Sequence, residues 1–183
     1  FADAPGALEA ARWRIEHAQV IAPEDIPRFG AMGVIASMQP SHAISDLHFA
    51  PARLGRSRLA GAYAWRALLD SGAVIAAGSD APVEKGDPLI EFYAAAHRHD
   101  LNGFAGPDWT LDQAVSRAAA LRMLTWGPAF AVFEESERGA LEAGRRADVS
   151  VFSVDLIEAA PEEIPRADAL LTIAGGQVTH DRL

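Results

Sequence analysis

Cysteine is absent from the 183 residues of this chain, and basic residues are outnumbered by acidic ones. Without cysteine there can be neither a disulfide framework nor a thiolate metal site, so a metal ion would have to be bound by histidine and carboxylate side chains. The 16 Lys and Arg against 25 Asp and Glu give a net charge of -9, and no cluster of basic residues stands out. Nucleic acid and anionic membranes are therefore not expected as partners.

Long apolar runs are lacking too. No stretch approaches the ~20 apolar residues of a membrane span, and the first residues do not show the basic-then-apolar pattern of a signal peptide. Half of the residues are nevertheless hydrophobic, which is enough for a core. These features favour a cytoplasmic globular protein. The chain starts with Phe1 instead of Met, and we expect it to be part of a longer protein.

In the first part of the chain, short apolar segments alternate with helical patterns. This alternation is typical of a parallel sheet covered by helices, either doubly wound or closed as a barrel. Three strands are too few to close a barrel. Residues 7–13 are rich in helix formers; strands are predicted at 14–18, 34–38 and 74–77, and helices at 23–32 and 61–71.

Further helices are predicted over residues 88–100 and 111–125, with another short one from Pro128. Thr110 is the predicted N-cap of the second, and Gln113 stands at the reciprocal position of a capping box.

The pattern changes at Glu134, where helical periodicity gives way to short alternating apolar runs. Gly175-Gly176 between two such runs predicts a hairpin, because glycine supplies the positive φ of a two-residue turn. We therefore expect two units, residues 1–133 and 134–183.

Polar residues follow each of the three predicted strands. These are His17, then Gln39 to His42, then Ser79-Asp80. Ligand sites of parallel α/β sheets lie at the carboxyl ends of the strands, so these residues converge if the strands are parallel neighbours. Imidazole and carboxylate bind zinc and similar ions, which lower the pKa of bound water to ~7. Asp80 is placed to bind such an ion, take the proton of the attacking water and return it to the leaving group.

Taken singly, these residues also fit ordinary structural roles. A lone histidine at a strand end is more often a hydrogen-bonded surface or core residue, and Asp80 alone could be a loop or capping residue. His42 and His48 lie in a predicted polar loop, where they could be solvated. His97 and His99 are two apart on a predicted helix, do not share a face, and are expected at the surface.

Ordered motifs distinguish between these alternatives, because five segments resemble the YtcJ-like amidohydrolases of the amidohydrolase 3 family. Two later segments are similar to the β-sandwich motifs of many amidohydrolases. The five are Arg14-Ile15-Glu16-His17-Ala18-Gln19, Ser37-Met38-Gln39-Pro40-Ser41-His42 with Asp46, Arg53-Leu54-Gly55, the segment 62–69, and Gly78-Ser79-Asp80-Ala81-Pro82-Val83; the later two are 139–148 and 172–178.

The resemblance implies an α/β fold that is the C-terminal portion of a metal-dependent hydrolase. Residues 1–133 would supply about three βα units of a (β/α)₈ TIM barrel, and residues 134–183 strands of a small composite β-sandwich. It also implies that His17 and Asp80 are metal ligands and that Asp80 shuttles the proton. The implied substrate contacts are Gln39, His42 and Ser79.

The implied activity is hydrolysis of C–N bonds, amide or cyclic amide, in a small molecule by hydroxide activated on one or two divalent ions, with zinc favoured. The family's His-x-His pair, its bridging Lys or equivalent and a further His are all expected before Arg14, and none of them occurs there. We therefore expect the chain alone to be inactive and to bind metal weakly or not at all. Its unpaired strands could favour a homo-oligomer. Two alternatives remain: a non-catalytic regulatory or binding protein with the same fold, and a complete small open-sheet α/β protein.

Overall fold

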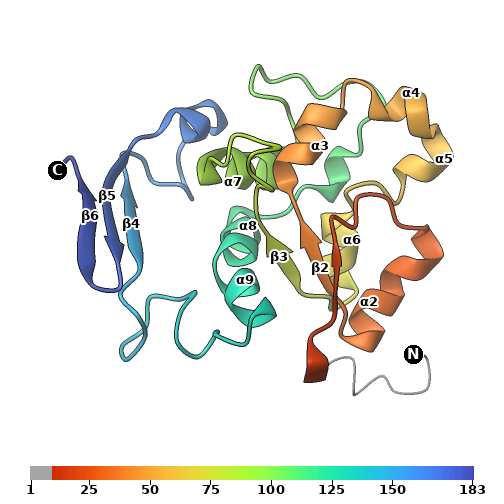
Figure 1. Cartoon of the computed structure of the whole chain (residues 1–183). Helices are drawn as coiled ribbons and strands as arrows, with labels where there is room; N and C mark the ends of the chain where they lie inside the picture. Colours follow the sequence, from red (N-terminus) through yellow and green to blue (C-terminus); the bar gives the residue numbers. More distant parts are fainter. Residues whose placement is uncertain (1–9) are drawn as a thin grey trace.

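The computed structural model describes residues 10–183, so residues 7–9 of the predicted helical segment 7–13 lie outside the described residues. Its centre is a three-stranded parallel sheet in the order β1-β2-β3, formed by β1 (Arg14–Glu16), β2 (Ile35–Met38) and β3 (Ile75–Ala77). Figure 1 shows these strands side by side with their helices around them. The predicted strands are thus confirmed as parallel neighbours.

Helices cover the two buried strands of this sheet. β2 and β3 consist almost entirely of buried Ile, Ala and Met, as expected for strands that are covered on both faces. α9 and α8 pack against β3, and α7 packs against both α3 and α8. The helices are α2 (Ile26–Met32), α3 (Pro40–Asp46), α4 (Ala50–Leu54), α5 (Arg56–Leu59), α6 (Trp65–Asp70), α7 (Pro88–His97), α8 (Arg117–Leu124) and α9 (Trp126–Ala131), with 3₁₀ turns η1 (Pro23–Asp25), η2 (Leu111–Gln113) and η3 (Pro161–Arg166).

Two predicted helices differ from the structure. The helix expected over 61–71 begins only at Trp65, and the one expected over 111–125 is a short η2 turn followed, after a break, by α8. The predicted cap at Thr110 is wrong: its side chain makes no capping bond. Ser116 caps α8 instead, and its hydroxyl accepts a hydrogen bond from the Ala119 amide at 3.2 Å. The Gln113 side chain is used elsewhere, since its oxygen accepts the Ala67 amide at 3.1 Å.

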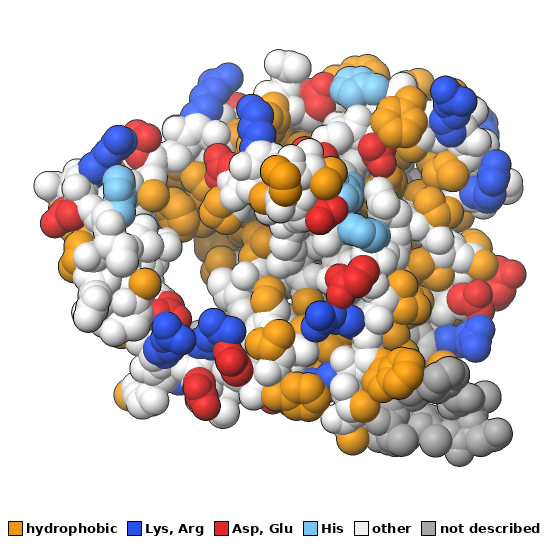
Figure 2. Space-filling view, in the orientation of Figure 1, with side chains coloured by type: hydrophobic (Ala, Val, Ile, Leu, Met, Phe, Trp, Pro, Cys, Tyr) orange, Lys and Arg blue, Asp and Glu red, His pale blue; other side chains and the backbone are white. Residues whose placement is uncertain are grey.

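A second sheet is antiparallel and lies beside the helices, away from β1 (Figure 1). It contains β4 (Val149–Phe152), β5 (Ala169–Ala174) and β6 (Gln177–Asp181) in that order. Gly175 and Gly176, with φ of 57° and 80°, form the turn between β5 and β6, which confirms the predicted hairpin. Figure 2 shows the surface hollowed between this sheet and the rest of the molecule.

Among the described residues, no strand pairs with the outer edge of the parallel sheet at β1, whose three residues are all exposed. A groove of about 400 Å³ runs beside it, and Ile15, Val20, Phe29 and Met32 are among its lining residues. Edge strands with free backbone groups and apolar neighbours are places where further strands or chains can add. Among the described residues, none of the helices has the length and apolar character needed to cross a membrane.

Candidate active site

Left-handed backbone conformations mark the carboxyl ends of β1 and β3. His17 directly follows β1 with φ of 67°, and Ala18 has φ of 42°. Asp80 lies three residues beyond β3 with φ of 55°. Residues other than glycine avoid this region, and where they adopt it the surrounding structure must hold them there. Both strand ends therefore turn sharply and leave a polar side chain at the same edge of the sheet.

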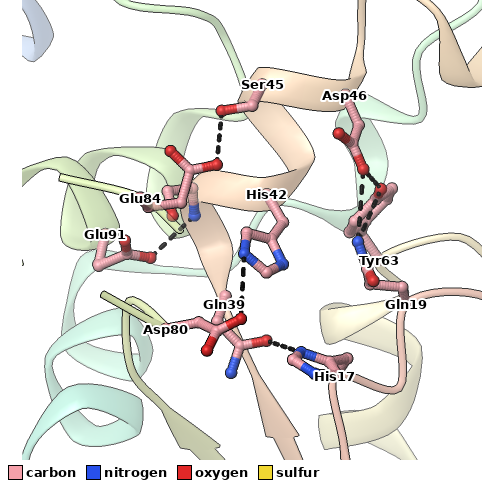
Figure 3. Close-up of polar contacts among 11 residues, drawn as sticks. His17, Gln19, Gln39, His42, Ser45, Asp46, Tyr63, Asp80, Glu84 and Glu91 are labelled. Atoms are coloured by element: carbon pink, nitrogen blue, oxygen red, sulfur yellow. Dashed lines mark hydrogen bonds and ion pairs between the residues drawn. The ribbon is translucent and has the colours of Figure 1, made fainter. Parts of the chain in front are cut away.

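The His17 and His42 side chains meet at this edge, as Figure 3 shows. Their rings stack with centroids 5.9 Å apart. The His17 Nδ1–H donates to Gln39 Oε1 at 2.9 Å. Because an amide oxygen can only accept, the neutral ring carries its proton on Nδ1 and its lone pair on Nε2. Gln39 thus fixes the tautomer that leaves Nε2 of His17 able to bind a cation.

His42 belongs to α3 and is 8% exposed, so its expected place in a polar loop is wrong. Pro40, whose fixed φ suits the first helical position, starts the helix here. Both ring nitrogens of His42 are buried without a hydrogen-bond partner, and Nε2 lies 4.0 Å from Asp80 Oδ2. The Asp80 side chain is 38% exposed, and Ser79 beside it is half-buried. The site is open to solvent on the Asp80 side and closed behind His42.

The side chains at this edge carry the types of donor atom that divalent metal ions bind in proteins. His17 offers an oriented imidazole, His42 has two unpartnered nitrogens, and Asp80 offers a carboxylate; these are the donors that zinc accepts in proteins without cysteine ligands. In the part of the chain that the structure describes, no group of three His, Asp or Glu side chains is close enough to hold an ion. The described residues thus bring two imidazoles and one carboxylate to this edge, without a complete set of ligands.

Glu91 on α7 is a site residue that the sequence did not reveal. Its side chain is buried, with 2% exposure, and Oε2 accepts the amide N–H of Ser41 at 2.8 Å. That amide is in the first turn of α3, where helices have unsatisfied donors. Gln39, the N-cap residue, makes no side-chain capping bond because its amide oxygen is bonded to His17. Glu91 caps α3 in its place, and burial raises its pKa above the ordinary value for glutamate.

The other histidines considered in the sequence analysis, His48, His97 and His99, lie away from this edge. His48 is exposed and pairs with Asp100 at 3.2 Å. His97 is half-buried instead of exposed: its ring packs against Tyr93, and burial followed by the charge of Arg117 lowers its pKa. His99 is also half-buried, and its Nδ1 is 2.5 Å from the His97 carbonyl oxygen.

A polar site at the carboxyl edge of parallel strands is the place where α/β proteins bind their ligands. The model of the Amidohydrolase family matches residues 2–180. The chain belongs to this family, and within it resembles the YtcJ-like members. It is 31% identical over 169 residues to the Bacillus subtilis protein YtcJ, named as an amidohydrolase, covering 92% of this chain and 32% of that protein.

Two other relatives carry different names. Protein LONG AFTER FAR-RED 3 of Arabidopsis thaliana is 32% identical, over 91% of this chain and 28% of its own length. N-substituted formamide deformylase of Arthrobacter pascens is 33% identical, over 64% of this chain and 21% of its own length. The chain spans about a third or less of the length of these curated relatives.

Solved structures of hydrolases share this fold. An uncharacterized metal-dependent hydrolase from Pyrococcus horikoshii matches with a TM-score of 0.71 and 28% identity, over 86% of this chain and 32% of that one. Atrazine chlorohydrolase TrzN from Arthrobacter aurescens TC1, complexed with zinc, matches with a TM-score of 0.61 and 25% identity, over 92% and 36% of the two chains. These matched solved structures are hydrolases, and one of them was solved as a zinc complex.

Proposed function

We propose that the intact protein hydrolyses a C–N bond, in an amide or a cyclic amide, of a small-molecule substrate. The observation that carries this proposal is the meeting of His17, His42 and Asp80 at the carboxyl edge of the parallel sheet. The relative named N-substituted formamide deformylase supports an amide-type substrate. The net charge of -9 supports a small molecule over nucleic acid.

In this proposal His17 and Asp80 are ligands of one or two divalent ions, with zinc favoured because a zinc complex is among the structural neighbours. A bound zinc ion supplies Lewis acidity and lowers the pKa of water to about 7. The Asp80 carboxylate takes the proton of the attacking water and passes it to the leaving nitrogen. Gln39 keeps the His17 tautomer and, with His42 and Ser79, contacts the substrate. The buried ring of His42 excludes water behind the reacting atoms.

We further propose that residues 1–133 are about three βα units of a (β/α)₈ barrel and that residues 134–183 are strands of a composite sandwich. The open edge of β1 and its apolar groove would pair with further barrel strands, which would also bring the remaining metal ligands. The chain covers only about a third of each hydrolase neighbour, which supports the proposal that further barrel strands exist. The chain alone would be inactive, and the protein cytoplasmic.

The test is turnover by the zinc-loaded, full-length protein on N-substituted formamides and cyclic amides. Asp80→Asn keeps the size of the side chain but cannot accept the proton, so we expect a loss of about 10²–10⁴-fold. Asp70→Asn is the matched control, because Asp70 is exposed at the end of α6, away from the site. Parental turnover by the Asp80 variant would show that another group is the base.

A second candidate is a non-catalytic binding or regulatory role for the same fold. Protein LONG AFTER FAR-RED 3, whose name states no reaction, is as similar in sequence as YtcJ, and a fold does not guarantee chemistry. The discriminating observation is the remainder of the full-length sequence. A His-x-His pair there favours the hydrolase, and its absence favours the second role.

A further inference from the structure

A set of polar contacts joins the loop after β1 to helix α3, outside the groups assigned to metal or substrate. Gln19 Nε2 donates to Asp46 Oδ2 at 3.4 Å and to the Tyr63 hydroxyl oxygen at 3.3 Å, and the Tyr63 hydroxyl donates to the same Asp46 oxygen. Figure 3 shows the three side chains converging beside His42. Gln19 is two residues after His17, and Asp46 is one helical turn after His42. The contacts therefore connect the two segments that carry the histidines.

The backbone of the same loop is bound by the segment around Tyr63. The Tyr63 amide donates to the Gln19 carbonyl at 2.7 Å, and the Ile21 amide donates to the Gly61 carbonyl at 2.9 Å. Val20 and Ala62 form an antiparallel bridge between these bonds. The approach is so close that a Cβ on Gly61 would lie 1.7 Å from the Ile21 oxygen. Residues 61–63 thus hold residues 19–21 through backbone and side chains together.

Tyr63 is itself firmly held. It is 3% exposed, its ring packs on Trp109 with centroids 5.5 Å apart, and its carbonyl accepts a hydrogen bond from Arg98 Nη1 at 2.8 Å. The Arg98 guanidinium lies over the Trp65 and Trp109 rings. Burial, followed by the neighbouring Asp46, raises the pKa of the Tyr63 hydroxyl above its ordinary value. The hydroxyl therefore stays protonated and donates to Asp46 throughout the neutral range.

From these contacts we infer that Tyr63 and Asp46 are positioning residues that set the place of His17 against His42. His17 is exposed and has a left-handed backbone, a conformation that persists only when the surroundings impose it. The Tyr63–Asp46–Gln19 contacts impose it from α3, the helix that also carries His42. The importance of this restraint for turnover rests on the proposed function, whereas the geometric inference does not.

The test follows the His17 and His42 ring signals by NMR in the metal-free, isotope-labelled chain. In Tyr63→Phe and Asp46→Ala we expect a shifted His17 ring signal and loss of the His17–His42 ring contact. Asp46→Asn keeps an oxygen acceptor for both donors and should restore both signals. Tyr93→Phe is the matched control, because the Tyr93 hydroxyl donates to the Asp100 carbonyl at 3.1 Å instead of to Asp46. Urea unfolding of each variant establishes that it is folded.

The inference is overturned if folded Tyr63→Phe and Asp46→Ala keep the parental His17 signal and ring contact, or if Tyr93→Phe changes them equally. These readouts involve neither metal nor turnover. A failure of the proposed hydrolase function, seen as parental turnover by Asp80→Asn in the full-length protein, therefore remains distinguishable from a failure of the positioning inference.

Discussion

For substitutions of Glu91, the structure predicts both the direction and the approximate size of the change in unfolding free energy. Its carboxylate accepts the buried Ser41 amide at 2.8 Å, so Glu91→Ala leaves this donor unsatisfied at the start of α3. The expected cost is about 1–3 kcal/mol of unfolding free energy. Glu91→Gln has nearly the same shape and keeps an oxygen acceptor, but removes a charge whose burial is unfavourable. We therefore expect the Gln variant to be at least as stable as the parent at about pH 8.

The pH dependence of stability gives the sharper measurement. Because burial raises the pKa of Glu91 in the folded state, the folded protein holds this proton more tightly than the unfolded chain does. Its contribution to stability is fully present below the ordinary pKa of glutamate and is lost as pH rises through the raised folded-state value. Glu91→Gln lacks this dependence, so its stability should fall less between about pH 5 and about pH 8.

Urea unfolding of parent, Glu91→Gln and Glu91→Ala at both pH values is the assay, with Glu24→Gln as a control at an exposed position. If the Gln variant loses stability with pH as steeply as the parent, Glu91 is not the titrating group. If Glu91→Ala costs nothing at either pH, the carboxylate does not cap α3.

The remaining predictions concern metal binding. Calorimetric titration of the 183-residue chain with zinc should give weak or no binding, since no group of three His, Asp or Glu side chains among the described residues is close enough to hold an ion; a tight stoichiometric site would contradict this. In the full-length protein, Gln39→Leu removes the acceptor that fixes the His17 tautomer, and the zinc dissociation constant should rise about 10–100-fold. Gln113→Leu, which loses a contact to the Ala67 amide instead, should leave zinc affinity unchanged, and equal effects of the two substitutions would exclude an orienting role for Gln39.

Local sequence patterns were sufficient where the structure depends on local interactions. The apolar runs that became β2 and β3 needed only their hydrophobicity and flanking glycines, and Gly175-Gly176 needed only its preference for positive φ. The sequence predicted that the polar residues after the strands converge if the strands are parallel neighbours, and His17, His42 and Asp80 do meet at one edge of the sheet.

The predictions were wrong where distant parts of the chain compete for the same group. Gln113 had the spacing of a capping box, but its side chain bonds to the Ala67 amide, and Ser116 starts the helix. Gln39 stands at the N-cap of α3, yet bonds to His17. Glu91, 50 residues away from Ser41 in the chain, takes over the capping. No local pattern reveals such an exchange of partners, although an acidic residue within the mostly apolar α7 is a sign of a buried contact.

At His17 and Asp80 the left-handed backbone favours a different residue from the one that the candidate site needs. At φ of 67° and 55° the residue with the least steric cost is glycine, and a side chain at such a position costs on the order of 1–3 kcal/mol. Substitutions chosen only to raise the melting temperature would therefore favour glycine at both positions and remove the imidazole and the carboxylate together. Thermostability screens on this protein therefore need a parallel selection for function, because loss of either side chain relieves backbone strain at the strand end.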